Sequence, residues 1–340
     1  MGCERIRTGV VAALGLATVA SADQRLWLAG VYADPSLAAP VVELLEERTE
    51  RSRLRFGVAA WTLSAEWERL QPDRRSRFLT IEAAPRNADA GERVYREGAR
   101  APELEFDGHA AELRAGWRGA RGERWGWELA AVVQSKSIES GERELRDRWR
   151  DPYAGASGGL RFRRVAADEP LSGRIEGLEL TGTARLMGGE ESYARLVVAL
   201  RAGQRHGALH FGQTVTVVAG GALDRVNAVL VGGSWDSGGA TTLYGFRYAE
   251  FRLERKGALV AMRMDLDAGD GWSLGLRGSL LAGDSQRAAG AGAVVERSFR
   301  GVVAAGGVFV GEQRGAARCC DPIYAVSVGS ALFSSRRNWF

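Results

Sequence analysis

The chain has 340 residues and a formal net charge of +4 at pH 7, with 45 glycines, 8 prolines and 3 cysteines. So mild a positive charge gives no reason to expect nucleic acid as a partner. Cys319 and Cys320 are adjacent, and one adjacent pair makes no disulfide framework, so their redox state stays open. Because no C-x-x-C, haem-attachment or zinc spacing occurs, we expect no cofactor and no metal.

The first residues have the features of an export signal. Arg5 and Arg7 precede a run of small apolar residues at 10–19, and Ala20-Ser21-Ala22 is an A-x-A cleavage site. The apolar run is well short of the roughly 20 residues that a spanning helix needs. We therefore expect residues 1–22 to be a cleaved signal peptide and residues 23–340 to form one exported domain.

The segment that follows the first predicted strand is the one helix that the sequence predicts. Residues 37–51 read LAAPVVELLEERTER, and Pro40 suits the first turn of a helix. The fold expected here is otherwise all-β, with this single short helix near residues 37–51.

Period-two alternation dominates the rest of the chain. In 258–266, for example, apolar residues alternate with Arg263 and Asp265, as expected when successive side chains leave opposite faces of a strand. Such runs are long enough for a transmembrane strand, which needs about 9–11 residues. Their charged faces would not suit a packed interior. The sequence predicts sixteen strands, at 25–33, 53–68, 76–85, 104–118, 124–136, 153–164, 172–186, 192–203, 206–219, 226–235, 242–254, 258–267, 271–282, 289–300, 302–311 and 324–333.

The links between these predicted strands alternate in length. Counted back from the C-terminus, the four longest links fall in the same alternating set, and they are 34–52, 86–103, 137–152 and 312–323. Barrels of the outer membrane have longer links on the external side and short turns on the periplasmic side. The long set is therefore expected to be external.

On these features the chain resembles Gram-negative outer-membrane β-barrel proteins over residues 23–340. The resemblance implies a transmembrane antiparallel up-and-down β-barrel of about 16 strands, with 12 or 14 left open. It also implies a place in the outer membrane, in contact with its lipid and lipopolysaccharide, while a homo-oligomer stays open. A terminal aromatic residue such as Phe340 is part of the signal that the barrel-assembly machinery reads in this class. Ser334, Arg336 and Asn338 depart from the apolar pattern expected just before it.

Sixteen strands and this length resemble general diffusion porins, although no specific porin family is matched. In those proteins the third external loop folds into the lumen, and by this count that loop is 137–152. The resemblance implies the constriction-loop candidates Glu142, Glu144, Asp147 and Asp151. Alternation places the pore-lining candidates on the polar face: Arg161, Arg163, Glu179, Arg185, Arg195, Arg201, Arg263 and Arg277. The function expected is a passive channel for small hydrophilic solutes with a weak anion preference.

Two alternatives stay open. Some outer-membrane barrels hydrolyse lipid, but the histidines after the signal peptide are only His109, His206 and His210, and no G-x-S-x-G motif accompanies them. His206 and His210 share one predicted strand, about 13 Å apart at about 3.3 Å per residue, too far to act together. We therefore expect no catalytic residue and no enzyme. The second alternative is a scaffold or export barrel without channel activity.

Overall fold

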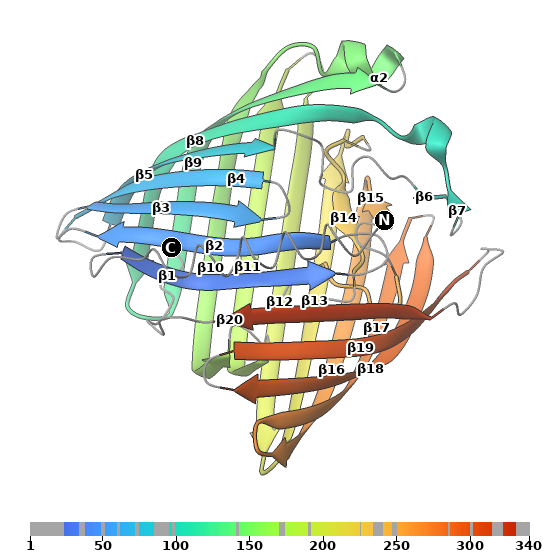
Figure 1. Ribbon diagram of the computed structural model, residues 1–340. Helices are drawn as coiled ribbons and strands as arrows, with labels where there is room; N and C mark the ends of the chain where they lie inside the picture. Colours follow the sequence, from blue (N-terminus) through green and yellow to red (C-terminus); the bar gives the residue numbers. More distant parts are fainter. Residues whose placement is uncertain are drawn as a thin grey trace.

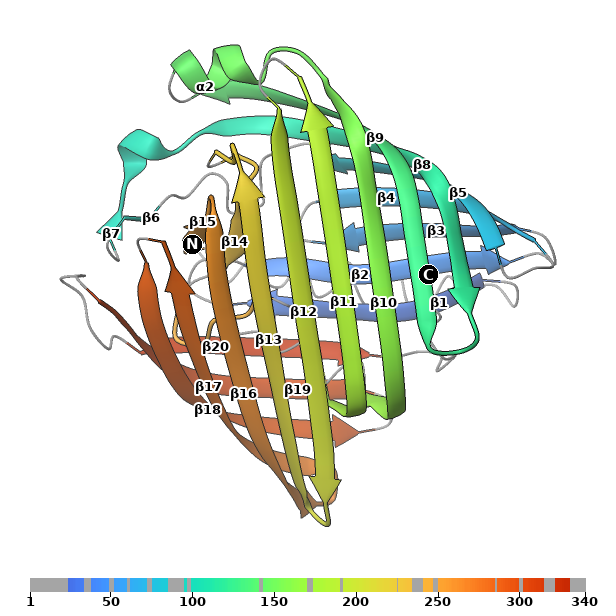
Figure 2. The same ribbon diagram turned by 180° about the vertical axis from the view of Figure 1, so that it is seen from behind.

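Sixteen strands form one closed antiparallel barrel in the computed structural model (Figures 1 and 2). Each barrel strand pairs with the next along the chain, and β1 closes the sheet on β20 through Ala29–Ala33 and Val326–Ser330. The prediction of an all-β barrel of about 16 strands is confirmed. The structure describes residues 24–33, 38–48, 52–59, 62–71, 75–84, 95–96, 99–140, 143–169, 174–189, 192–224, 226–233, 241–246, 250–284, 286–299, 302–314 and 322–330.

The elements of the barrel follow the chain order. The wall consists of β1 (Gln24–Ala33), β2 (Ala38–Arg48), β3 (Ser52–Ala59), β4 (Thr62–Leu70), β5 (Arg75–Ala84), β8 (Asp107–Arg121), β9 (Trp125–Ser140), β10 (Tyr153–Glu169), β11 (Arg174–Gly188), β12 (Tyr193–His206), β13 (Leu209–Gly221), β16 (Lys256–Gly269), β17 (Trp272–Gly283), β18 (Arg287–Phe299), β19 (Val302–Gln313) and β20 (Ile323–Ser330). Two small hairpins are not part of the wall. They are formed by β6 (Tyr95–Arg96) with β7 (Ala99–Arg100) and by β14 (Val229–Val231) with β15 (Phe251–Leu253). Within the described residues, the helical elements are η1 (Pro102–Leu104) and α2 (Arg143–Arg148).

The two faces of the wall differ in polarity. Large apolar side chains such as Leu160 and Leu186 point outward and are 63% and 64% exposed, whereas their neighbours Arg161 and Arg185 point inward. Soluble proteins rarely expose so extensive an apolar surface, and a bilayer is the solvent that suits it. Exposed tryptophans, including Trp67, also lie on the outer face, as in the aromatic girdles of membrane barrels. No helix among the described residues is long and apolar enough to cross a membrane.

Long and short links separate to opposite ends of the barrel. The longest links, 85–106, 141–152 and 222–255, leave one end, which we call the loop end; α2 and β6–β7 lie there in both views (Figures 1 and 2). The other end, called the turn end here, carries only links of two to four residues, such as 207–208. The predicted long links 86–103, 137–152 and 312–323 correspond to links of the loop end, whereas the predicted link 34–52 is wrong because it contains β2, and most of the link 222–255 was predicted as strands.

The predicted helix over 37–51 is wrong, because residues Ala38–Arg48 form strand β2. The register of β2 against β3 shifts between Glu43 and Leu45, which marks a β-bulge or irregularity. An extra residue at such a point interrupts the two-residue period, so the apolar residues cease to alternate. The sequence therefore loses its strand signature although the backbone remains extended.

Two further strand predictions need correction. With β2 they add two strands to the wall and remove two, so the predicted number of sixteen is unchanged. The predicted strand 53–68 is two strands, β3 and β4. The predicted strands 226–235 and 242–254 do not belong to the wall, because β13 pairs directly with β16 over Leu209–Ala219. The link 141–152 is consequently the fourth link of the loop end and not the third, which is 85–106.

Candidate functional site

The link 222–255 between β13 and β16 enters the barrel, and we call it the lumen loop. Its apolar side chains Val231, Leu243 and Phe251 are buried against inward-facing side chains of the wall. The wall residues of this cluster are Val218, Leu259, Leu281 and Ala288, from β13, β16, β17 and β18. The hairpin β14–β15 of this loop therefore docks against the inner face of the C-terminal half of the wall.

Glycines on the wall make room for the lumen loop. The backbone of Tyr244 lies so close to Gly290 that a Cβ atom there would overlap the Tyr244 carbonyl oxygen. The backbone N–H of Tyr244 also donates a hydrogen bond to Ser279 Oγ of the wall at 2.9 Å. Gly311 lies in the same way against Phe246. The backbone of the loop thus lies in direct contact with the backbone of the wall, and this contact fixes the position of the loop.

A second group of side chains covers the start of the lumen loop at the loop end. Trp149, which follows α2, is 1% exposed and stacks on Tyr153 with ring centroids 4.5 Å apart. Its indole N–H donates to Asp224 Oδ2 at 2.9 Å. Leu145 of α2 belongs to the same apolar cluster, together with Tyr193 of β12. The link 141–152 therefore packs over the lumen loop at the mouth of the barrel.

The predicted constriction-loop acids lie on the other side of this link. Glu144, Asp147 and Asp151 are exposed, and Asp147 pairs with Arg143 one turn earlier at 3.6 Å. Glu142 lies outside the described residues. The constriction role of these four acids stays a prediction, whereas the segment seen to dock against the inner wall is the lumen loop.

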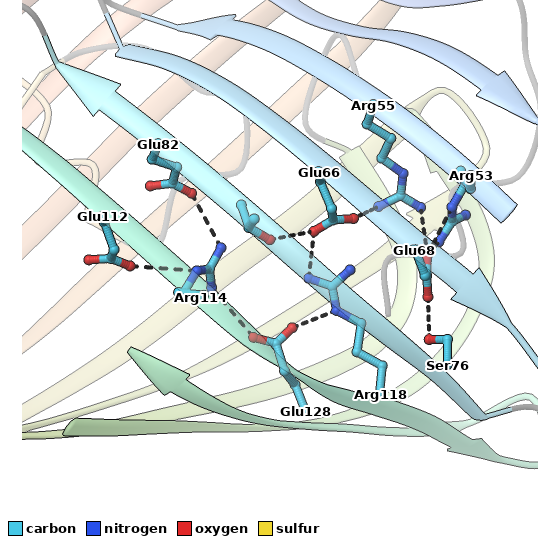
Figure 3. Close-up of polar contacts among 11 residues, drawn as sticks. Arg53, Arg55, Glu66, Glu68, Ser76, Glu82, Glu112, Arg114, Arg118 and Glu128 are labelled. Carbon is cyan, nitrogen blue, oxygen red and sulfur yellow. Dashed lines mark hydrogen bonds and ion pairs between the residues drawn. The ribbon is translucent and has the colours of Figure 1, made fainter. Parts of the chain in front are cut away.

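The inner face of β3, β4, β5, β8 and β9 carries a network of ion pairs (Figure 3). Arg118 lies at its centre, 2.7 Å from both Glu66 and Glu128. Arg114 joins Glu128 to Glu82 at 3.4 and 3.2 Å. Further members are Arg53, Arg55, Glu68, Ser76, Thr80 and Glu112. Four arginines and five glutamates face one another here, so this part of the wall is close to charge balance.

The inner face of β10, β11 and β12 differs, because arginine is in excess. The central parts of these strands direct five arginines inward with one glutamate, Glu179. We call this set the basic wall, and its arginines are Arg161, Arg163, Arg185, Arg195 and Arg201. Glu179 pairs with Arg161 at 2.6 Å and with Arg201 at 3.2 Å. One carboxylate is thus shared by two guanidinium groups.

Two other arginines of the basic wall face each other directly. Arg185 of β11 and Arg195 of β12 are cross-strand partners in the register. Glu112, reaching from β8, accepts two hydrogen bonds from Arg185 at 2.7 and 2.8 Å. Arg195 instead donates to the backbone carbonyl of Asn227 in the lumen loop at 3.4 Å. Like charges directly opposite in a sheet repel, so this row holds positive charge that the protein balances incompletely.

The remaining pore-lining candidates, Arg263 and Arg277, lie in a balanced cluster. Both are 2.8 Å from Asp265, which is 1% exposed. The guanidinium group of Arg174 lies 3.5 Å from the carboxylate of Asp265 and 3.2 Å from that of Glu296. Sequence reasoning found Arg263 and Arg277 through strand parity. It missed Asp265 as their partner, although that residue shares their face.

The three histidines lie on different elements. His109 of β8 is half exposed and 3.2 Å from Glu139, while His206 is exposed at the end of β12. His210 of β13 is buried, with Nε2 3.0 Å from the carbonyl oxygen of Ile175. The turn 207–208 separates His206 from His210, so the prediction of one strand containing both is wrong. Within the described ranges no group of three metal-ligating side chains could hold an ion.

Comparison of the sequence with models of protein families gave no match, and neither did comparison with curated proteins. Solved structures do resemble the barrel. BamA from Haemophilus ducreyi, in a form lacking POTRA domains 1–3, superposes with a TM-score of 0.61 at 9% identity, over 89% of this chain and 69% of that one. CdiB from Escherichia coli gives 0.56 at 10% identity, over 92% and 64%. CdiB from Acinetobacter baumannii gives 0.55 at 11% identity, over 90% and 59%.

These similarities concern the fold, and the chain spans about 59–69% of the length of the structures compared. The neighbours share its large antiparallel barrel, while the identities are too low to place it in one family. The chain therefore has the fold of bacterial outer-membrane β-barrels.

Proposed function

We propose that the chain is a passive, porin-like channel for small hydrophilic solutes, with an anion preference and with its lumen narrowed by the lumen loop. The observation that carries the proposal is a closed wall that is apolar outside and charged inside. Rings of charged side chains are the usual basis of selectivity in such pores.

The anion preference rests on the basic wall. Five arginines and one glutamate, Glu179, point inward from the central parts of β10–β12, so positive charge exceeds negative charge there. Glu112 of β8 adds one further carboxylate, which pairs with Arg185. The other two charged regions of the wall are close to balance and would add little bias. An anion entering the lumen would therefore meet an attractive potential on one side.

Conductance across planar bilayers tests this function. Refolded protein should open steps that favour chloride over potassium, and replacing Arg195 and Arg201 by Glu should reverse that preference. The matched control is Arg146→Glu on the exposed face of α2, which should leave the preference nearly unchanged. Unaltered selectivity in the double variant would remove the two arginines from the conducting path. A folded barrel without channel steps would exclude the channel.

The second candidate function is a scaffold or export barrel without channel activity. The apolar anchoring of the lumen loop favours it, because Leu243, Phe251 and Leu253 are each at most 3% exposed against the wall. A loop held this firmly suits a plug. Native barrels that conduct only after the loop is removed would support this candidate over the open channel.

The location proposed is the Gram-negative outer membrane, reached through a cleaved signal peptide at residues 1–22. The loop end would face the exterior and its lipopolysaccharide, and the turn end the periplasm. Phe340, outside the described residues, is proposed as the residue that the barrel-assembly machinery reads. Its deletion should lower the amount of barrel assembled in cells without preventing refolding in detergent. Equal assembly of both forms would contradict this role.

A further inference from the structure

Two cations of the wall are held by the lumen loop through backbone carbonyls. Lys136 of β9 donates from Nζ to the carbonyl of Val226 at 2.9 Å, and Arg195 donates to the carbonyl of Asn227, the next residue, at 3.4 Å. Neither cation forms an ion pair with a carboxylate within 4.0 Å among the described residues. Two positive charges therefore meet one short stretch of neutral backbone.

Two buried polar groups of the lumen loop and the inner wall have no hydrogen-bond partner among the described residues. Asn227 is 4% exposed, and its side-chain oxygen accepts from the N–H of Asp224 at 2.8 Å, so the amide NH₂ is the group left over. That buried Nδ2 has no hydrogen-bond partner among the described residues. Ser157 Oγ is also buried without a partner, and Ser157 lies directly opposite Arg185 in the register of β10 and β11. Asn227 thus adds an unused donor next to the two cations, and Ser157 adds one in the row of Arg185.

The charge balance of this region indicates its ligand. Ser157, Arg185 and Arg195 are cross-strand neighbours on β10, β11 and β12. Cationic side chains therefore lie side by side on two neighbouring strands. The nearby carboxylates have other partners. Glu112 forms an ion pair with Arg185, and Asp224 accepts a hydrogen bond from Trp149 and pairs with Arg148. Partly buried charge without a counter-ion is costly, and an anion placed there would gain both charge and hydrogen bonds. Guanidinium groups bind carboxylate and phosphate well because their donors match oxyanion geometry.

We propose that Lys136, Arg195 and Asn227 form a binding site for the oxyanion group, carboxylate or phosphate, of a small solute. The anion would take the hydrogen bonds that the carbonyls of Val226 and Asn227 now accept. An ionised acceptor adds charge–charge attraction to these hydrogen bonds, which the neutral carbonyls do not supply. Binding would thereby loosen the start of the lumen loop from β9 and β12. The site deepens the proposed channel by naming the class of anion that it takes, and it rests on that function for its physiological role.

Calorimetric titration of the refolded barrel with inorganic phosphate, and separately with acetate, tests the site. Saturable binding of at least one of them is expected, with at least a tenfold loss of affinity in Lys136→Gln and in Arg195→Gln. The control is Arg121→Gln, at the turn end of β8, which should bind as the native barrel does. Heat-modifiable gel migration shows that each variant is folded, and if Arg195→Gln does not fold, Lys136→Gln carries the test.

Absence of saturable binding for both probes, or native affinity in a folded Lys136→Gln variant, would overturn the site. The channel is judged separately by conductance. Binding without conductance would support the site and exclude the channel. Conductance without binding would support the channel and exclude the site.

Discussion

The carbonyl oxygen of Tyr244 in the lumen loop lies directly over Gly290 of β18, where no side chain larger than hydrogen fits. The N–H of Tyr244 donates to Ser279 of the neighbouring strand β17 at 2.9 Å. One residue of the loop is thus fixed to two adjacent strands. This relationship makes the docking of the loop testable by single substitutions on the wall.

Gly290→Val should displace the lumen loop without opening the barrel, because the new side chain needs the space that the Tyr244 carbonyl occupies. We expect larger single-channel conductance and faster cleavage of the loop by trypsin, with unchanged heat-modifiable migration. Gly278→Val on β17 is the matched control, since a Cβ there meets open space. A native conductance and cleavage rate in Gly290→Val would show that the loop is not held at this point.

Glu179→Gln should strengthen the preference for anions. The carboxylate pairs with Arg161 and Arg201, so its neutralisation leaves both guanidinium groups without their shared counter-ion. Reversal potentials in a salt gradient should shift toward chloride, whereas Glu123→Gln in the exposed turn before β9 should leave them unchanged. A shift toward potassium, or none, would contradict a role of the basic wall in selectivity.

Leu160→Arg should destabilise the barrel in a bilayer. Leu160 points outward from β10 and is 63% exposed, so the charge would lie in hydrocarbon. Arginine on the lipid face costs about 2–4 kcal/mol near the midplane of a membrane barrel, and less near its interfaces. Urea unfolding from phospholipid vesicles measures this loss. Gln204→Arg, at the turn end of β12, should cost much less, and equal losses for both variants would argue against a membrane-spanning wall.

Much of the wall could be predicted from the sequence because a strand with one face in lipid and one in water keeps a strict two-residue period. That period located the strands from β8 to β13 and from β16 to β19. It failed at β2, where the register shift after Glu43 places apolar residues next to one another and imitates a helix. The link 60–61 contains no glycine, proline, asparagine or aspartate to separate β3 from β4.

The lumen loop could not be recognised by the same signal. The strand β14 reads Val229-Leu230-Val231, an apolar run that a strand of the wall could also have, and such a run does not reveal whether lipid or protein covers its apolar face. The candidate site shows the same limit. Parity identified the arginines that point inward, whereas the partners of Arg185 and Arg195 come from β8 and from the loop, far away in the sequence.

Replacing residues 226–253 by a short Gly-Ser linker, and comparing single-channel conductance with that of the native barrel, tests the central claim most directly. The barrel should persist, because Leu209–Ala219 of β13 pairs directly with Lys256–Leu266 of β16 and this pairing does not involve the loop. We predict that the shortened barrel keeps its heat-modifiable migration and conducts several times more current per step than the native barrel. A folded, shortened barrel with native conductance, or with none, would contradict a channel narrowed by the lumen loop.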